Sequence, residues 1–104
     1  MREQHQSTFI VPADHPSLRG HFPGSPVVPG VVVLDHVLKT TAHWKQRALN
    51  VTGLRQVKFH APLLPSQIAD VTVDLEGGAL AFRVTRGEQT IAQGTFTLGP
   101  AVHP

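Results

Sequence analysis

Cysteine is absent from the sequence, and charged residues make up only 15% of it. Without cysteine, the chain can form neither a disulfide framework, nor a thiolate nucleophile, nor a cysteine-ligated zinc site. No apolar run reaches the length of about 18 residues that a membrane span requires. Residues 1–6 lack the apolar core of a secretory signal. From these absences we expect a cytoplasmic protein that does not enter the membrane.

Acidic residues are also missing from one long stretch of the chain. The net charge of +2 is too small to indicate nucleic-acid binding, but residues 37–68 contain five basic residues and no Asp or Glu. Cations favour the C-terminal half of a helix and the solvated faces of strands, which would explain this stretch without a function. Alternatively, the stretch forms a basic face for an acidic partner. The five basic residues are Lys39, Lys45, Arg47, Arg55 and Lys58.

The length and the apolar content set limits on the fold. A chain of 104 residues can hold one domain, because a second domain would be too small to form its own core. Hydrophobic residues make up 40% of the chain, so disorder is not expected. We therefore predict one domain over residues 1–104, with its core over about residues 8–98 and a loose tail over residues 99–104.

Proline and apolar periodicity mark the first half of the chain. Residues 8–11 can form a short strand, which Pro12 ends. Five of the nine prolines lie between residues 12 and 29, which predicts a rigid, irregular loop. A helix is predicted over residues 30–50, because apolar residues recur there at spacings of three and four. The first two turns of this helix are apolar nearly all round, which indicates that the core buries them.

The second half of the chain alternates between apolar and polar residues. This alternation is typical of half-buried strands and covers residues 56–61, 71–76, 80–85 and 92–98. The segments 76–78 and 86–88 are predicted to be hairpin turns. One helix packed on one face of an antiparallel sheet is an α+β layer. An open edge of that sheet would be a natural site of dimerisation.

Two features break these local patterns. Asp35 stands among valines and leucines of the predicted helix, where a carboxylate is costly unless it is paired or protonated. It could be a structural acid with a satisfied charge, or an acid kept neutral for catalysis. The second feature is the segment 20–30, whose prolines and glycines hold the backbone of His21 just before the predicted helix. A single histidine in a loop could also simply be solvated.

Considered together, these features form a complementary set of catalytic parts. The histidine can accept a proton at neutral pH. A carboxyl group in apolar surroundings can donate one. The backbone amides of Gly30 and Val31, at the start of the helix, can hold a carbonyl oxygen while negative charge develops on it.

The segment 20–35 reads Gly-His-Phe-Pro-Gly-Ser-Pro-Val-Val-Pro-Gly-Val-Val-Val-Leu-Asp and closely resembles the signature of the hotdog-fold 3-hydroxyacyl-[acyl-carrier-protein] dehydratases. In that family the catalytic histidine and acid stand 14 positions apart, as His21 and Asp35 do. Residues 57–65, Val-Lys-Phe-His-Ala-Pro-Leu-Leu-Pro, resemble the strand after the family's helix. The resemblance covers about residues 8–98 and implies a single hotdog fold, in which an antiparallel sheet wraps around one central helix.

The sequence departs from the commoner family pattern in three places. Its acid is Asp35, where the commoner branch has glutamate. Ser66 and Gln67 replace a usual Gly-Asp pair. The segment that commonly precedes the first strand is missing. In its small size the chain is similar to the dehydratases of aryl-polyene and related pigment clusters.

The resemblance implies a role for each matching residue. His21 would take the proton from C2 of a 3-hydroxyacyl thioester, and Asp35 would protonate the departing 3-hydroxyl group. The amides of Gly30 and Val31 would bind the thioester carbonyl. The product would be a trans-2-enoyl thioester, made without a metal or a redox cofactor. The phosphopantetheine arm would arrive as part of the substrate.

The resemblance also implies partners. Acyl carrier proteins are acidic, so they would suit the basic stretch, which Arg19 could join. The family's histidine and acid meet across a dimer interface, which would place His21 of one chain near Asp35 of the other. The alternatives are a hotdog thioesterase and a non-catalytic hotdog subunit that pairs with a larger dehydratase. No metal site is expected, because His36 and His43 have no carboxylate at ligand spacing.

Overall fold

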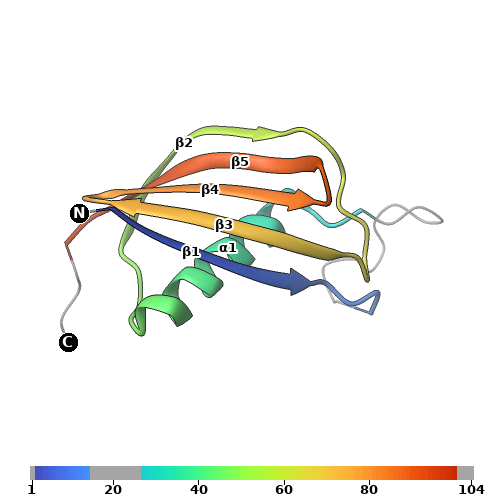
Figure 1. The fold of residues 1–104 in the computed structure, drawn as a ribbon, viewed down its shortest axis with the longest axis horizontal. Helices are drawn as coiled ribbons and strands as arrows, with labels where there is room; N and C mark the ends of the chain where they lie inside the picture. Colours follow the sequence, from blue (N-terminus) through green and yellow to red (C-terminus); the bar gives the residue numbers. More distant parts are fainter. Residues whose placement is uncertain (1, 15–26, 101–104) are drawn as a thin grey trace.

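A curved antiparallel sheet packs across one side of a helix (Figure 1). The structure is a computed structural model that describes residues 2–14 and 27–100. The strand order is β1-β3-β4-β5-β2, and all neighbouring strands are antiparallel. This arrangement confirms the predicted α+β hotdog fold. The elements are β1 (Arg2–Ile10), α1 (Gly30–Lys45), β2 (Val51–Phe59), β3 (Ile68–Glu76), β4 (Ala79–Arg86) and β5 (Gln89–Leu98).

Two glycine turns join the last three strands. Gly77 and Gly87 both have a φ of 59°, a backbone conformation that glycine adopts without steric cost. Each glycine is the first central residue of a two-residue hairpin, where a positive φ matches the twist of the flanking strands. The predicted turns and the alternation of β3 and β4 are therefore confirmed.

The helix α1 ends earlier than the sequence predicted. It stops at Lys45 rather than near Asn50, because Gln46 takes the left-handed conformation with a φ of 58°. The amides of Gln46 and Arg47 close the last turn onto the carbonyl oxygens of His43 and Ala42. A glycine usually marks such an end, and glutamine gives no such signal.

The core lies between α1 and the inner face of the sheet. Val33, Val37 and Thr41, spaced four residues apart, form the buried face of the helix. The Thr41 hydroxyl donates a hydrogen bond to the Val37 carbonyl oxygen at 2.8 Å, so its burial leaves no polar group unsatisfied. The strands contribute buried residues that include Phe9, Val71, Val73, Leu80, Phe82, Val84, Ile91 and Phe96.

Strand β1 begins at Arg2 rather than at Thr8, where the sequence pattern predicted its start. It pairs with β3 over its whole length, from Arg2 opposite Glu76 to Ile10 opposite Ile68. The strand thus starts before the predicted core, although Phe9 is its first buried residue.

Polar residues on the inner face of β1 conceal its alternation in the sequence. Two of these residues, Glu3 and His5, find partners on the helix instead of lying in apolar surroundings. The His5 ring stacks on the Trp44 indole with 5.0 Å between ring centroids, and Glu3 forms an ion pair with Lys45. Only the packed helix reveals why polar residues occupy these inward positions.

Strand β2 forms one open edge of the sheet and carries a bulge. Its register with β5 shifts between Arg55 and Lys58, where Gln56 has a φ of 56°. A bulge interrupts the regular row of free amides and carbonyls that an edge strand presents. Three apolar side chains of this strand stay exposed, Val51 at 40%, Leu54 at 44% and Phe59 at 52%.

Gly99 and Pro100, which the sequence placed in a loose tail, are bonded to the start of β2. The Gly99 amide donates to the Asn50 carbonyl oxygen at 2.8 Å. The Asn50 side-chain amide donates to the Pro100 carbonyl oxygen at 3.1 Å. The rest of the predicted tail, residues 101–104, lies outside the described residues.

Candidate active site at the start of the helix

The first turns of α1 carry three of the four residues predicted for the chemistry. Gly30 is the first residue of the helix, Val31 follows it, and Asp35 lies about one turn further on. The predicted general base, His21, lies outside the described residues, as does the predicted docking residue Arg19. The structure therefore places the amide donors and the acid on the first turns of one helix.

Among the described residues, the amides of Gly30 and Val31 are available as hydrogen-bond donors. The first amides of a helix have no intrahelical partner. The next two, those of Val32 and Val33, both point to the Pro29 carbonyl oxygen, at 3.0 and 3.3 Å. No carbonyl or side chain in the described part of the chain accepts from Gly30 or Val31. Two free amides at the positive end of a helix dipole favour a developing negative charge.

Gly30 leaves room for the close approach of the Phe59 ring. A Cβ atom built on Gly30 would lie 2.7 Å from Cζ of Phe59, closer than carbon atoms pack. The absence of a side chain at residue 30 lets the ring lie against the helix start. The absence of a Cβ atom at residue 30 therefore matters for packing, and the backbone amide of the same residue is the predicted hydrogen-bond donor.

An apolar crevice of about 450 Å³ opens beside Gly30. Its walls are shaped by an extra residue in β5, Ile91, whose carbonyl oxygen accepts from the His60 amide at 2.8 Å and the Ala61 amide at 3.4 Å. The Val28 amide donates to the Leu63 carbonyl oxygen at 2.8 Å and holds the chain before the helix against the other wall. The lining residues are Val27, Val28, Gly30, Val33, Phe59, His60, Ala61, Pro62, Leu63 and Ile91.

His60 is a crevice residue to which the sequence pattern assigned no role. It is exposed, and it follows directly after β2, between Phe59 and the proline-containing turn at residues 61–65. The alternation of residues 56–61 placed it on the outer face. His60 lines the crevice because the amides of His60 and Ala61 donate hydrogen bonds to the Ile91 carbonyl oxygen. No local sequence pattern indicates these hydrogen bonds.

Asp35 is exposed in this chain, and the prediction that the core buries it is wrong. Its side chain is 55% exposed and forms an ion pair with Lys39 at 2.8 Å. Val31, four residues earlier on the same side of the helix, is 74% exposed. The valines around Asp35 suggest burial on every side, but the sheet covers only the side of Val33 and Val37.

The basic stretch does not form a single face. Lys39 pairs with Asp35, and Lys45 pairs with Glu3 and lies 5.1 Å from the centre of the Trp44 ring. The hydrogen bond from Lys45 lowers the pKa of Glu3 below its usual value. Arg47 is exposed just beyond the end of α1, whereas Arg55 and Lys58 lie on β2. The five cations are thus divided between the helix and the sheet.

Two further observations concern the described residues alone. None of their helices has the length and apolar character needed to cross a membrane. No three of their histidine, aspartate and glutamate side chains gather in a way that could hold a metal ion.

Comparisons with known proteins find dehydratases. The chain matches the ApeI-like family, described as ApeI dehydratase, over residues 1–95. It is 30% identical over 88 residues to the 3-hydroxyacyl-[acyl-carrier-protein] dehydratase FabZ of Acetivibrio thermocellus, covering 78% of this chain and 58% of that protein. It is 28% identical over 100 residues to FabZ of Myxococcus xanthus, covering 83% of this chain and 65% of that protein. The chain therefore spans less than two thirds of the length of these relatives.

Solved structures share the fold. A chain of the dehydratase heterocomplex ApeI:P from Xenorhabdus doucetiae superposes with a TM-score of 0.83 at 24% identity, over 96% of this chain and 95% of that one. The fluoroacetyl-CoA thioesterase FlK superposes with a TM-score of 0.61 at 21% identity, over 90% of this chain and 82% of that one. At such identities the likeness speaks for the fold alone. Because the family match spans nearly the whole chain, the protein belongs to the ApeI-like dehydratase family.

Proposed function

We propose that the protein dehydrates 3-hydroxyacyl thioesters, carried by acyl carrier protein, to trans-2-enoyl thioesters. One observation carries the proposal: Gly30, whose amide has no acceptor among the described residues, borders an apolar crevice, and Val31 and Asp35 follow it on the same helix. Amide donors suit a thioester oxygen, and apolar walls suit an acyl chain. Membership of the dehydratase family supports this reaction.

In the proposed mechanism, His21 removes a proton from C2 of the substrate. The electron pair of that C–H bond forms the C2–C3 double bond as the C3–O bond breaks. Asp35 gives a proton to the departing hydroxyl group, which leaves as water. The Gly30 amide, helped by that of Val31, stabilises the negative charge on the thioester oxygen. Loss of one such donor typically costs on the order of 3 kcal/mol of transition-state stabilisation.

We further propose that a second subunit completes the site. The side chain of Asp35 and the neighbouring Val31 are exposed in this chain, and a proton donor acts best where water is excluded. A partner packed on this side of α1 would cover both residues and bring its own His21 to Asp35. The partner is a second copy of this chain or another dehydratase. The second possibility has a parallel in the structural relative from Xenorhabdus doucetiae, which forms the dehydratase heterocomplex ApeI:P.

The remaining parts of the proposal follow from the reaction itself. Proton transfer between His21, the substrate and Asp35 needs no metal ion and no redox cofactor. The acyl chains would be those of fatty-acid or aryl-polyene-like biosynthesis, which takes place in the cytoplasm.

The direct test is incubation of the purified protein with a panel of carrier-bound 3-hydroxyacyl thioesters, read by mass spectrometry. Loss of one water with growth of the ultraviolet absorbance of an enoyl thioester is the expected result. Release of free thiol would instead indicate a thioesterase. Near-normal rates in both His21→Ala and Asp35→Asn would show the mechanism to be wrong.

If the purified chain is inactive by itself, one further measurement is needed. Co-expression with another dehydratase subunit, followed by native mass spectrometry, separates an enzyme that pairs with itself from one that needs a different subunit. If activity of the mixed complex survives Asp35→Asn in this chain, the chain is a non-catalytic subunit.

A further inference from the structure

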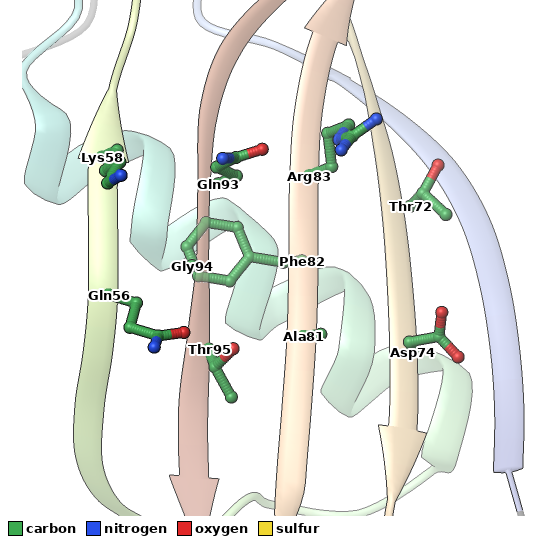
Figure 2. A pocket seen from close by; sticks show the side chains of 10 residues that line it. All are labelled: Gln56, Lys58, Thr72, Asp74, Ala81, Phe82, Arg83, Gln93, Gly94 and Thr95. Carbon is green, nitrogen blue, oxygen red and sulfur yellow. The ribbon is translucent and has the colours of Figure 1, made fainter.

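A polar groove crosses the face of the sheet that points away from α1. It has a volume of about 720 Å³ and is formed by β2, β3, β4 and β5 (Figure 2). Small residues make its floor: Ala81 stands beside Thr95, and Gly94 has no side chain. The Phe82 ring lies beneath Gly94, so close that a Cβ atom on residue 94 would be 3.0 Å from it. The groove therefore has a firm, well-packed base.

Two cations stand across this groove. Lys58 on β2 and Arg83 on β4 both pair with Gln93 on the strand between them, so the three residues form one row across the sheet. Two strand spacings separate the Cα atoms of Lys58 and Arg83 by about 10 Å. Both cations are exposed, and no carboxylate of the described residues forms an ion pair with either.

The surroundings of this row are basic on β2, β4 and β5, whereas the outward acids Asp70, Asp74 and Glu76 all lie on β3. Arg55 lies opposite Thr95 and therefore on the same outer face. The outward positions of β2, β4 and β5 carry no acid. The one carboxylate that lines the groove, Asp74 on β3, is already neutralised by Arg2, whose Nε lies 2.5 Å from Oδ1. It also accepts a hydrogen bond from Gln4 at 3.0 Å.

The groove adjoins the candidate active site. Lys58 and Phe59 are consecutive residues at the end of β2, and the first lines the groove while the second lines the apolar crevice. A partner seated in the groove would thus lie around the sheet edge from the free amides of Gly30 and Val31.

We propose that this groove docks a carboxylate-rich helix of an acidic protein. The identity of that protein rests on the proposed function, which makes it the acyl carrier protein. Carboxylates two turns apart on a helix are separated by about 11 Å, which matches the spacing of Lys58 and Arg83. Arg83 can hold a carboxylate through two parallel hydrogen bonds, and the Gln93 side-chain amide adds a donor between the cations. This surface differs from the group of docking residues expected from the sequence. Lys39 and Lys45 form ion pairs with Asp35 and Glu3, and Arg83 on β4 is a docking residue that the sequence did not indicate.

The first experiment measures binding of holo acyl carrier protein without an acyl chain, by calorimetry and by NMR shift perturbation. We expect the double variant K58A/R83A to raise the dissociation constant about tenfold, and Arg83→Ala alone a few-fold. Arg86→Ala is the matched control, because it removes the same charge from the hairpin end of the same strand and should change binding less than about twofold. Circular dichroism checks that all variants are folded.

Three results would overturn the docking proposal. The double variant could bind like the wild type, the control could lose as much affinity as Arg83→Ala, or the NMR shifts could map away from residues 56–58, 81–83 and 93–95. Equal binding of a DNA duplex would likewise overturn it, because it would show attraction to any polyanion.

A second experiment separates this proposal from the proposed function. The wild type and K58A/R83A are assayed with a carrier-bound substrate and with the same acyl group on free pantetheine. We expect KM for the carrier-bound substrate to rise about tenfold in the variant, with kcat/KM for the pantetheine thioester unchanged within about twofold. If the wild type dehydrates neither substrate, the proposed function fails, and the binding measurement still decides the role of the groove.

Discussion

The two sides of helix α1 differ in how far the sheet covers them. Val33, Val37 and Thr41 are fully covered by the sheet, whereas Val31 is 74% exposed and Asp35 55% exposed on the opposite side. Both sides carry valines, so composition does not distinguish them. The difference teaches that the chain uses one side of the helix for its own stability. The other side, which carries the candidate acid, stays exposed, and we propose that a partner covers it.

The largest expected effect concerns the exposed side. Asp35→Asn removes the proposed proton donor with little change of volume, so kcat should fall on the order of a thousandfold. The free energy of unfolding should change by less than about 0.5 kcal/mol, because the residue is exposed. Steady-state kinetics and urea unfolding check the two halves of this prediction. A large loss of stability would instead give Asp35 a structural role.

On the buried side of α1, a substitution should change the free energy of unfolding. Val37→Ala leaves a cavity under the sheet and should lower the free energy of unfolding by about 2 kcal/mol. Val31→Ala, the matched control on the exposed side, should lower it by less than about 0.5 kcal/mol in the monomer. Equal losses in the two variants, measured by chemical denaturation, would contradict the comparison between the two sides.

A charge placed on the exposed side tests whether a partner covers it. In the proposed dimer, Val31→Lys would bury an ammonium group whose nearest carboxylate, Asp35, already pairs with Lys39, so the dissociation constant of the dimer should rise about tenfold or more. Analytical ultracentrifugation gives this constant directly. Arg47→Ala serves as a reference for a change at an exposed position just beyond the end of the same helix. A dimer that tolerates Val31→Lys must be formed through another surface.

The smallest effect is expected on the outer face of the sheet. Hydrogen bonds from Arg2, and next from Gln4, lower the pKa of Asp74. A carboxylate whose pKa is lower in the folded than in the unfolded state stabilises the fold above its unfolded pKa of about 4. This contribution is lost as the pH falls through the folded pKa. Asp74→Asn should therefore be slightly less stable than the wild type at pH 7, and the difference should close as the pH falls below about 4. A constant difference in thermal unfolding across this range would contradict the assignment.

Much of the sheet could be predicted from the sequence because its signals are local. Strands β3 and β4 alternate residue by residue, and Gly77 and Gly87 mark the turns that only glycine forms easily. The first half of β1 could not be predicted, because His5 and Glu3 face partners on α1 that lie about 40 residues away. The helix end at Gln46 was missed for a similar reason, since no glycine announces its left-handed conformation.

The candidate site, like the fold, could be predicted from the sequence only in part. The identity of Gly30, Val31 and Asp35 follows from the motif over residues 20–35, and the helix start that presents the two amides follows from the prolines and valines around it. The place of His21 stays a prediction, because that residue lies outside the described part of the chain. The neighbours Phe59, His60 and Ile91 come from distant segments, and the bulge in β5 that joins them has no local signature.

By itself, the sequence determined the fold class, the hairpins, the start of the helix and the likeness to the dehydratases, because periodicity, turn residues and a long motif are properties of neighbouring residues. Only the tertiary structure decided that Asp35 is exposed, that Lys39 and Lys45 are engaged in ion pairs, and that Arg83 joins Lys58 across a groove. The physical reason is the same for all three. Which side of a helix is covered, and which side chains share a face of the sheet, depends on the packing and the strand register of segments far apart in the chain.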